Sequence, residues 1–263
     1  MTKLIFMEGV SGVGKTTMTR MLEKELQDAG YTVRIYAEFD FTNPIDFYCT
    51  AYLTHAETDA LRRKYPAETE TIRRYTIPAG EAVLVRYFDE DTPLFPEDLL
   101  EELRGYEFCW HPKRLVPLSA YTAAYRAVWQ NFAAGLDGTY DYILFDGSLL
   151  HHPINDMMRN YRCTPEEALA HVKVLMDALG TVERQIFYLE PADIGVQLAR
   201  AHRDRGQAEP DAEQIAFWEE RGTKDHFVLE NLGEAYTMYN VTEEGWDTVR
   251  GKILRTLTDD DRK

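Results

Sequence analysis

The chain has 263 residues, of which 44% are hydrophobic and 28% charged, a composition typical of a folded globular protein. This length exceeds a minimal domain but falls short of two full ones, so we expect a single domain over residues 1–263 with an elaborated insertion. Its 45 acidic and 29 basic residues give a net charge of −16, which repels nucleic acid and anionic membranes. We therefore expect neither as a partner, and a phosphate-bearing ligand would need a local set of donors.

The sequence carries no signal for secretion, disulfide bonding or membrane insertion. Cys49, Cys109 and Cys163 are too few and too scattered for a disulfide framework or a four-ligand zinc site. The N-terminus lacks the pattern of a signal peptide, and no stretch approaches the roughly 18 apolar residues of a membrane span. We expect a cytoplasmic protein.

The first elements predict a strand, a glycine loop and a helix in that order. Residues 4–7 form a short apolar run, typical of a strand buried on both faces in a parallel sheet. Beyond the glycines, hydrophobic residues at helical spacing from Met18 to Ala29 predict a helix that Gly30 ends. Residues 32–37 predict a second strand.

The second half of the chain continues the alternation of strands and helices. Alternating elements predict an α/β fold with a parallel sheet, right-handed crossovers and helices on both faces. Strands are expected at 142–145, 185–189 and 235–241, and helices at 120–134, 165–179, 194–202 and 246–257. Residues 41–119 interrupt this pattern as an insertion with seven of the eleven prolines, a predicted strand at 82–88 and a predicted helix at 96–103.

The loop after the first strand matches the pattern G-x-x-x-x-G-K-[ST] of a P-loop. In such a loop, backbone N–H groups converge on phosphate oxygens, Lys15 reaches the β and γ oxygens, and Thr16 binds Mg²⁺. The helix that follows adds the partial positive charge of its N-terminus. We assign nucleotide binding to Gly9, Val10, Ser11, Gly12, Val13, Gly14, Lys15, Thr16 and Thr17.

An acidic residue ends the strand expected at 142–145. An apolar strand that ends in a carboxylate is typical of a Walker B strand, which places the acid beside the magnesium of the P-loop. We therefore predict Asp146 as a second metal ligand with Thr16. The alternative is an aspartate that only stabilises a turn.

Two acids follow the second strand. Glu38 and Asp40 are expected at the carboxyl edge of the sheet, where ligands of open α/β folds bind. Either could accept the proton of an attacking hydroxyl, and we prefer Glu38; the alternative is that both simply solvate the end of the strand.

Three arginines predict a lid at about residues 194–210. Arg200, Arg203 and Arg205 could close over ATP and stabilise the charge of the transferring phosphoryl group. The alternative is a solvated helix in which Asp204 offsets the arginines.

Taken in this order, these motifs resemble those of the deoxynucleoside kinase and thymidylate kinase group of P-loop kinases. The resemblance covers roughly residues 1–40 and 120–257, and residues 187–191 followed by the three arginines carry its second most specific match. It implies a five-stranded parallel core of the P-loop NTPase fold, an arginine-bearing lid, and Mg-ATP as the phosphoryl donor.

The chain departs from that group at the substrate side. Asp146-Gly147-Ser148 stands where thymidylate kinases usually have Asp-Arg-Tyr and deoxynucleoside kinases Glu-Arg-Ser, so an arginine that would bind substrate or phosphate is missing. Glu38-Phe39-Asp40 replaces the Glu-Pro of deoxynucleoside kinases, and the insertion matches neither. These differences favour another hydroxyl-bearing acceptor, such as a sugar, a metabolite or an antibiotic.

Aromatic residues of the insertion region are candidates for an acceptor pocket, because the walls of clefts are mostly apolar and aromatic. The alternative is that they belong to the core. His151, His152 and Asp156 suggest a metal site, although neighbouring residues usually point apart, so polar contacts near the acceptor or plain surface are the favoured alternatives. The aromatic candidates, with one histidine, are Phe39, Phe41, Phe47, Tyr48, Tyr52, Phe108, Trp110 and His111.

Together these features predict a kinase that transfers the γ-phosphoryl group of ATP to a hydroxyl of a small molecule, with Mg²⁺. A nucleoside or nucleoside monophosphate acceptor is the alternative within this class. A partner-dependent ATPase switch is the alternative outside it, although the Asn-Lys-x-Asp element of GTPases is absent. The acceptor, its reacting hydroxyl, the choice between ATP and GTP, and the oligomeric state stay open, with a homodimer as one alternative.

Overall fold

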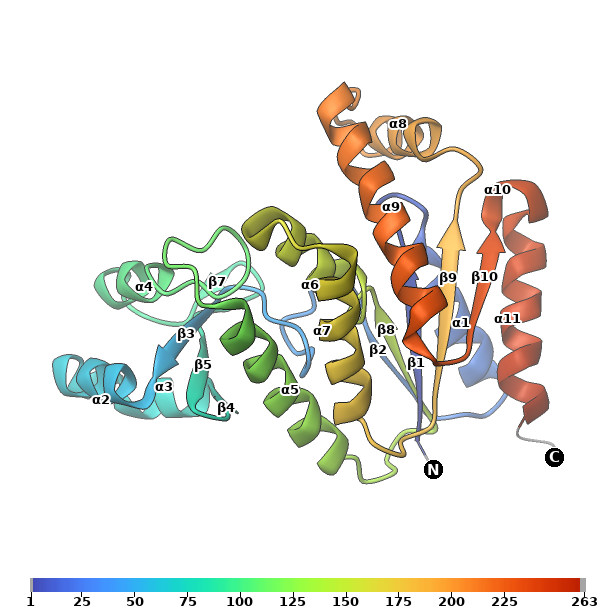
Figure 1. Cartoon of the computed structure of the whole chain (residues 1–263). Helices are drawn as coiled ribbons and strands as arrows, with labels where there is room; N and C mark the ends of the chain where they lie inside the picture. The colour runs from blue at the N-terminus through green and yellow to red at the C-terminus, as the bar shows by residue number, and fades with distance from the viewer. Residues whose placement is uncertain (1, 261–263) are drawn as a thin grey trace.

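The computed structural model describes residues 2–260, and a five-stranded sheet with all strands parallel forms its centre. The order across the sheet is β10–β9–β1–β8–β2, so the strand that leads into the glycine loop lies in the middle (Figure 1). The predicted α/β fold with a five-stranded parallel sheet is confirmed. The strands are β1 (Lys3–Gly9), β2 (Val33–Tyr36), β8 (Tyr142–Asp146), β9 (Arg184–Glu190) and β10 (Tyr236–Asn240).

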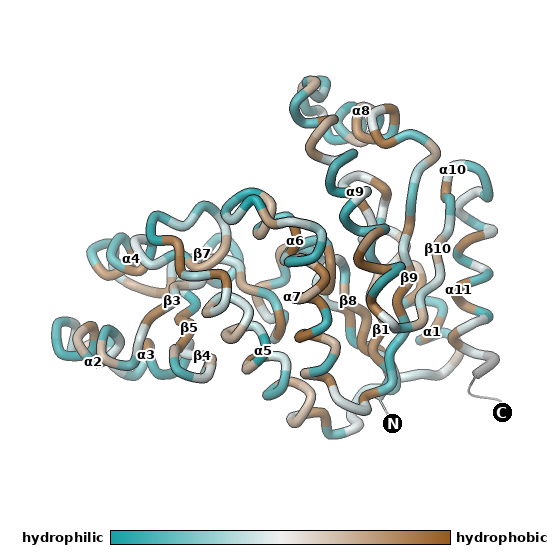
Figure 2. Tube along the Cα trace, viewed as in Figure 1, coloured by the Kyte–Doolittle hydropathy of each residue, from teal (hydrophilic) through white to brown (hydrophobic). Residues whose placement is uncertain are grey.

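Helices cover both faces of this sheet, as the alternation of elements predicts (Figure 1). Ile5 and Met7 face α1 and α11, whereas Leu4 and Phe6 face α5, α7 and α9, because successive side chains of a strand point to opposite sides. All four are fully buried, which explains why residues 4–7 of β1 are a continuous apolar run. Figure 2 shows the same concentration of hydrophobic residues in the middle of the sheet. The helices are α1 (Lys15–Asp28), α5 (Leu118–Ala134), α7 (Pro165–Ala178), α9 (Ala212–Leu232) and α11 (Trp246–Asp260).

Short helices lie near the carboxyl ends of the strands and position residues around the glycine loop. After β8 comes α6 (His151–Asp156), which continues directly into a π-helical turn, η2 (Met157–Tyr161). After β9 comes α8 (Ile194–Asp204), which lies above the end of the sheet in Figure 1. The turn after β10 is α10 (Val241–Glu244).

The insertion forms an antiparallel subdomain beside α5, away from α11 (Figure 1). Its three-stranded sheet has the order β3–β5–β4 and packs with its helices around a separate hydrophobic cluster. The strand expected at 82–88 ends at Arg86, and the helix expected at 96–103 is α4. The elements are β3 (Thr50–Thr54), α2 (His55–Lys64), η1 (Pro66–Glu68), α3 (Thr69–Arg74), β4 (Thr76–Ala79), β5 (Ala82–Arg86), β6 (Phe88–Asp89), β7 (Thr92–Pro93) and α4 (Glu97–Arg104).

The 21-residue helix α9 is absent from the sequence-based assignment. Its buried face includes Arg221, Lys224 and Asp225, so polar residues interrupt the hydrophobic spacing that would reveal it. No helix within residues 2–260 is long and apolar enough to cross a membrane.

Candidate active site

The glycine loop takes a path that only glycine allows at its two ends. Gly9 has φ +140°, and an added Cβ would lie 2.2 Å from the carbonyl oxygen of Leu189. Gly14 has φ +93°, and an added Cβ would lie 2.5 Å from the ring of Trp246. Side chains at either position would therefore force the loop away from β9 or from α11, so the sequence pattern here reflects close packing as well as backbone conformation.

The start of α1 is arranged to bind an anion. It has no acidic residue in its first turn, and no described side chain caps it, so its N-terminal N–H groups keep their partial positive charge. Lys15 is buried; its Nζ donates to the carbonyl oxygen of Val10 at 3.3 Å and lies 3.3 Å from Nδ1 of His151. This geometry holds an ammonium group beside the loop, where it could meet phosphate oxygens.

Thr16 and Asp146 lie together, as expected of two metal ligands. Because β1 pairs with β8, Met7 is in register with Asp146, and the Thr16 hydroxyl donates to Oδ2 of Asp146 at 2.5 Å. The other carboxylate oxygen, Oδ1, is buried and has no hydrogen-bond partner among the described residues. A buried oxygen without a partner is unfavourable unless an ion or water satisfies it, so this pair fits the Mg²⁺ ion that the motif implies.

The two acids after β2 take different positions. The backbone N–H of Glu38 donates to Oδ2 of Asp146 at 3.4 Å, which places Glu38 next to the proposed metal ligands. Asp40 points into its own turn, where Oδ1 accepts from the N–H and hydroxyl of Thr42 at 2.8 and 2.6 Å, and Oδ2 pairs with Arg34 at 3.5 Å. The structure therefore brings Glu38 to the P-loop and engages Asp40 elsewhere.

A cavity of about 220 Å³ opens beside the P-loop. Of the eight ring-bearing candidates in the insertion region, four line it, and Tyr52 and Phe108 pack on or in the main core instead. The Phe41 ring contacts Tyr48, and His111 packs on Trp110, but neither lines the cavity. The lining residues are Ser11, Glu38, Phe39, Asp46, Phe47, Tyr48, Cys109, Trp110, Tyr125, His151, His152, Asn155, Asp156, Arg159 and Trp218.

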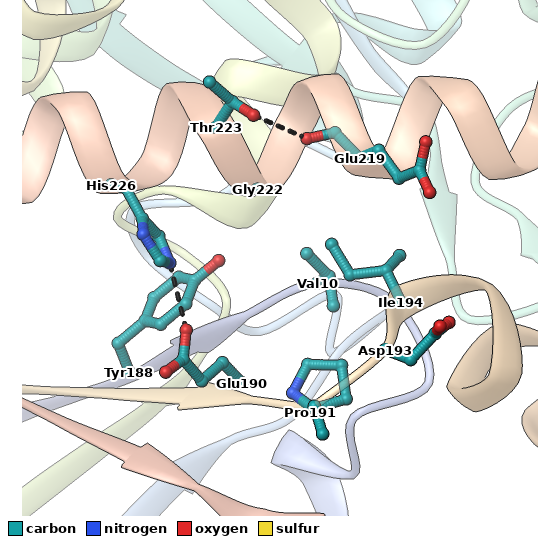
Figure 3. A pocket seen from close by; sticks show the side chains of 11 residues that line it. Val10, Tyr188, Glu190, Pro191, Asp193, Ile194, Glu219, Gly222, Thr223 and His226 are labelled. Carbon is teal, nitrogen blue, oxygen red and sulfur yellow. Dashed lines mark hydrogen bonds and ion pairs between the residues drawn. The ribbon is translucent and has the colours of Figure 1, made fainter.

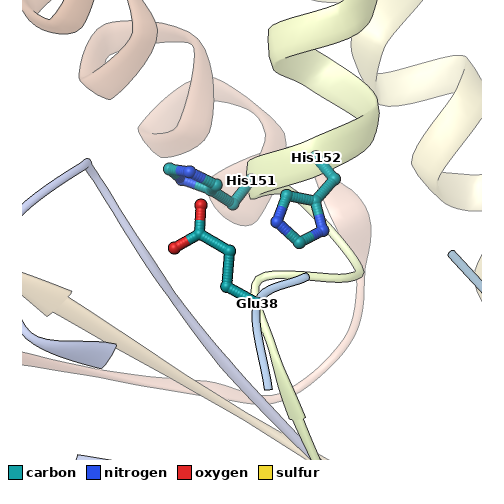
Figure 4. Close-up of side chains that lie close together, drawn as sticks. All are labelled: Glu38, His151 and His152. Carbon is teal, nitrogen blue, oxygen red and sulfur yellow. The ribbon is translucent and has the colours of Figure 1, made fainter. Parts of the chain in front are cut away.

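Two neighbouring histidines face this cavity together rather than pointing apart. Ligand atoms of Glu38, His151 and His152 all lie within 4.8 Å of one another (Figure 4), so Glu38 rather than Asp156 completes the cluster. His152 Nδ1 hydrogen bonds to Asp46, and its Nε2 lies 2.7 Å from the Tyr48 hydroxyl. Because these partners engage both nitrogens of His152, a metal ion here would have to displace them, and the cluster fits polar contacts in the cavity wall better.

The environment shifts the pKa values of the two histidines in opposite directions. Burial, followed by the positive charge of Lys15, holds the pKa of His151 well below its usual range, so this ring is neutral. Burial also favours neutral His152, but the carboxylate of Asp46 overcomes it, and the net pKa of His152 is raised. Trp218 of α9 stacks on His151 with ring centroids 5.3 Å apart, which fixes the neutral ring beside Lys15.

A buried glutamate fixes the start of α6 beneath these histidines. Both oxygens of the Glu8 carboxylate accept backbone N–H groups, from Leu149 at 2.8 Å and from His151 at 2.9 Å. Burial raises the pKa of Glu8 to about 7, and the two N–H groups oppose this rise. The last residues of β1 thus hold the helix that lines the cavity.

The segment expected as a lid packs on the P-loop through a glutamine instead of its arginines. Gln197 Nε2 donates to the carbonyl oxygen of Gly12 at 2.7 Å. Arg200 pairs with Asp204 at 3.9 Å, and all of these arginine side chains are accessible to solvent. Arg203 pairs with Glu209 at 3.1 Å, and Arg205 caps the end of α8. In this structure α8 packs on the loop, and Arg200 and Arg203 pair with exposed acids.

The sequence reasoning missed Asn155, Arg159 and Trp218. The first two lie on α6 and η2, where lining residues fall at positions 151, 152, 155, 156 and 159. This spacing is that of one helical face, so the pattern after Asp146 could have revealed them together. Trp218 lies on α9, whose own pattern is obscured, and nothing in the sequence connects it to His151.

A second hollow of about 420 Å³ lies between the end of β9 and α9 (Figure 3). Its polar lining is mainly acidic: Glu190, which pairs with His226 at 3.1 Å, and the carboxylates of Asp193 and Glu219. These charges disfavour a phosphate-bearing ligand in this hollow.

Comparison with known proteins leaves the family undetermined. No family model matches the chain, and no curated protein matches its sequence. Among solved structures, the chain is similar to the YorR protein of Bacillus subtilis in complex with phosphorylated GDP. The two share 12% sequence identity and a TM-score of 0.47, over 99% of this chain and 98% of the other.

Proposed function

We propose that this protein is a kinase that transfers the γ-phosphoryl group of ATP to a hydroxyl of a small molecule, such as a metabolite, a sugar or an antibiotic. The observation that carries the proposal is the cavity, because its wall includes Ser11 of the P-loop and His151 beside Lys15. The aromatic side chains that line this cavity suit an organic molecule bound next to the phosphates. A switch ATPase has no need of such a cavity at this position.

The reaction follows from the groups around the loop. The acceptor oxygen attacks the γ phosphorus, the bond to the β–γ bridging oxygen breaks, and ADP leaves; the hydroxyl proton passes to Glu38. Lys15 and the N-terminus of α1 neutralise the phosphate charge. Thr16 and Asp146 would hold Mg²⁺, which supplies further neutralisation of the β and γ oxygens when bound.

The arginines of the proposed lid fit this reaction if α8 moves. Among residues 2–260, Arg200 and Arg203 are held only by exposed ion pairs, which contribute little energy. Phosphate oxygens could therefore replace Asp204 and Glu209 as partners, and Arg205 at the end of the helix could join them. We assign all three arginines to stabilisation of the transferring group in the closed state.

The test is ADP release with Mg-ATP across nucleosides, nucleoside monophosphates, sugars and hydroxyl-bearing antibiotics. Lys15→Ala serves as the blank, and Lys24→Ala, an exposed change on the same helix, is the matched control. Stimulation by one acceptor class, lost in Lys15→Ala and kept in Lys24→Ala, supports the kinase and names its substrate class. Steady hydrolysis that no acceptor stimulates would contradict it and favour the partner-dependent ATPase.

A further inference from the structure

An arginine outside the lid lies in the wall of the cavity. Arg159 belongs to the π-helical turn η2, a rare conformation that often occurs at functional sites. It lines the same cavity as Glu38 and His151 and remains accessible to solvent. Neither the P-loop nor the proposed magnesium site accounts for it.

This arginine has no ion-pair partner within the described part of the chain, although the protein has 45 acidic residues. Asp156 is the acid that influences its ionisation, but Oδ1 of Asp156 accepts from Asn160 at 2.6 Å instead. Burial also raises the pKa of Asp156 to about 7, which reduces its negative charge near neutral pH. Arg159 therefore brings a positive charge without an ion-pair partner among the described residues to the wall of the cavity.

Two aromatic rings hold the guanidinium group in place. The Cζ atom of Arg159 lies 4.8 Å from the centroid of the Trp110 ring and 5.1 Å from that of Phe217. Stacking against rings leaves the N–H donors at the edge of the planar group, in the fork that matches a carboxylate or phosphate. Trp110 is itself 56% exposed, so this contact lies at the mouth of the cavity.

The position of Arg159 sets where a bound anion would lie. It follows His151 by eight residues, which corresponds to roughly 12 Å along a helix. Arg159 thus lies about two helical turns beyond the histidine that contacts Lys15, whereas the position next to the proposed magnesium ligand is Gly147 and offers no charge. A ligand that fills the cavity can meet the P-loop with one end and Arg159 with the other.

We propose that the acceptor carries an oxyanion, a carboxylate or a phosphate, at the end opposite its reacting hydroxyl, and that Arg159 binds this group. The inference rests on the proposed kinase function, because that function places the hydroxyl near Glu38. Arg159 would then select anionic hydroxy compounds over neutral sugars and nucleosides as acceptors.

The test measures how matched anionic and neutral probes bind to the 263-residue chain. Tryptophan fluorescence reports the binding, since Trp110 and Trp218 line the cavity. The pairs are gluconate and glucose, shikimate and its methyl ester, and pantothenate and pantothenol. We expect an anionic probe to bind more tightly than its partner. Arg159→Gln should weaken that binding by roughly 10- to 100-fold and leave the neutral probe unchanged.

Two further variants make the result specific. Arg159→Lys should restore part of the preference, because lysine keeps the charge but loses the fork, and Arg63→Gln, an exposed change on α2, should have no effect. If no anionic probe is preferred, or if Arg159→Gln keeps the preference, the inference is overturned. ADP release with neutral acceptors alone would also overturn the inference while preserving the kinase. Arg159-dependent binding without ADP release by any acceptor would overturn the kinase and leave Arg159 as an anion-binding residue.

Discussion

Restoring a side chain at residue 147 tests why this chain lacks the arginine of the kinases it resembles. Gly147 has φ +77°, and an added Cβ would lie 2.9 Å from Cβ of His151 and 3.4 Å from Cε of Lys15. A left-handed backbone conformation costs a residue with a side chain about 1–2 kcal/mol, and overpacking adds typically about 1–3 kcal/mol. Gly147→Ala should therefore lower the free energy of unfolding by about 2–5 kcal/mol, and Gly147→Arg by at least as much.

Gly138→Ala is the matched control, because Gly138 has φ +78° and nothing within 4 Å of an added Cβ. The free energy of unfolding of Gly138→Ala should fall only by the cost of the left-handed backbone conformation, about 1–2 kcal/mol. Urea unfolding followed by circular dichroism gives both values, and their difference isolates the contact with His151. Equal losses in the two variants, or a Gly147→Ala protein as stable as wild type, would refute the view that His151 excludes a side chain here.

Three further predictions concern the metal, the base and pH. Asp146→Asn should remove the magnesium dependence of nucleotide binding, and an unchanged Mg²⁺ titration would exclude this residue from the site. Glu38→Gln should slow phosphoryl transfer roughly 100-fold or more with little change in ATP affinity, whereas Asp40→Asn should transfer nearly normally; equal rates would reassign the base. Burial raises the pKa of Glu107 to about 7 from 4.5, so its folded form holds a proton that the unfolded chain releases. The unfolding free energy of wild type, relative to that of Glu107→Gln, should therefore fall by about 3 kcal/mol at most as pH rises from 4.5 to 7. A difference between the two proteins that does not change with pH would contradict that pKa.

Local signals were sufficient for the core of the fold. The run before Gly9 and the strand that ends at Asp146 are buried on both faces, so each appears as an uninterrupted apolar segment. Sequence reasoning failed for α9, because Arg221 and Asp225 form a fully buried ion pair on its inner face. The pair lies four residues apart on one helix, and only tertiary packing buries it, so in the sequence it looks like solvent-exposed surface.

The choice between Glu38 and Asp40 shows where sequence reasoning stops at the site. Both acids follow β2 within four residues, but only the folded turn commits Asp40 to Thr42 and leaves Glu38 facing the cavity. Likewise, the adjacent positions of His151 and His152 suggest side chains that point apart. In the fold, Tyr48, from another part of the chain, hydrogen bonds to His152 in the wall of the cavity.

The sequence alone determined the glycine loop that we propose binds phosphate, because the conformation of residues 9–16 and the helix dipole depend on local glycines and on the strand and helix around them. Tertiary structure alone decided the cavity that we propose for the acceptor. The cavity is assembled from the β2–β3 connection, the loop before α5, the helix after β8 and α9, which are far apart in the chain. Their meeting depends on packing across the sheet, and no spacing within one segment encodes it.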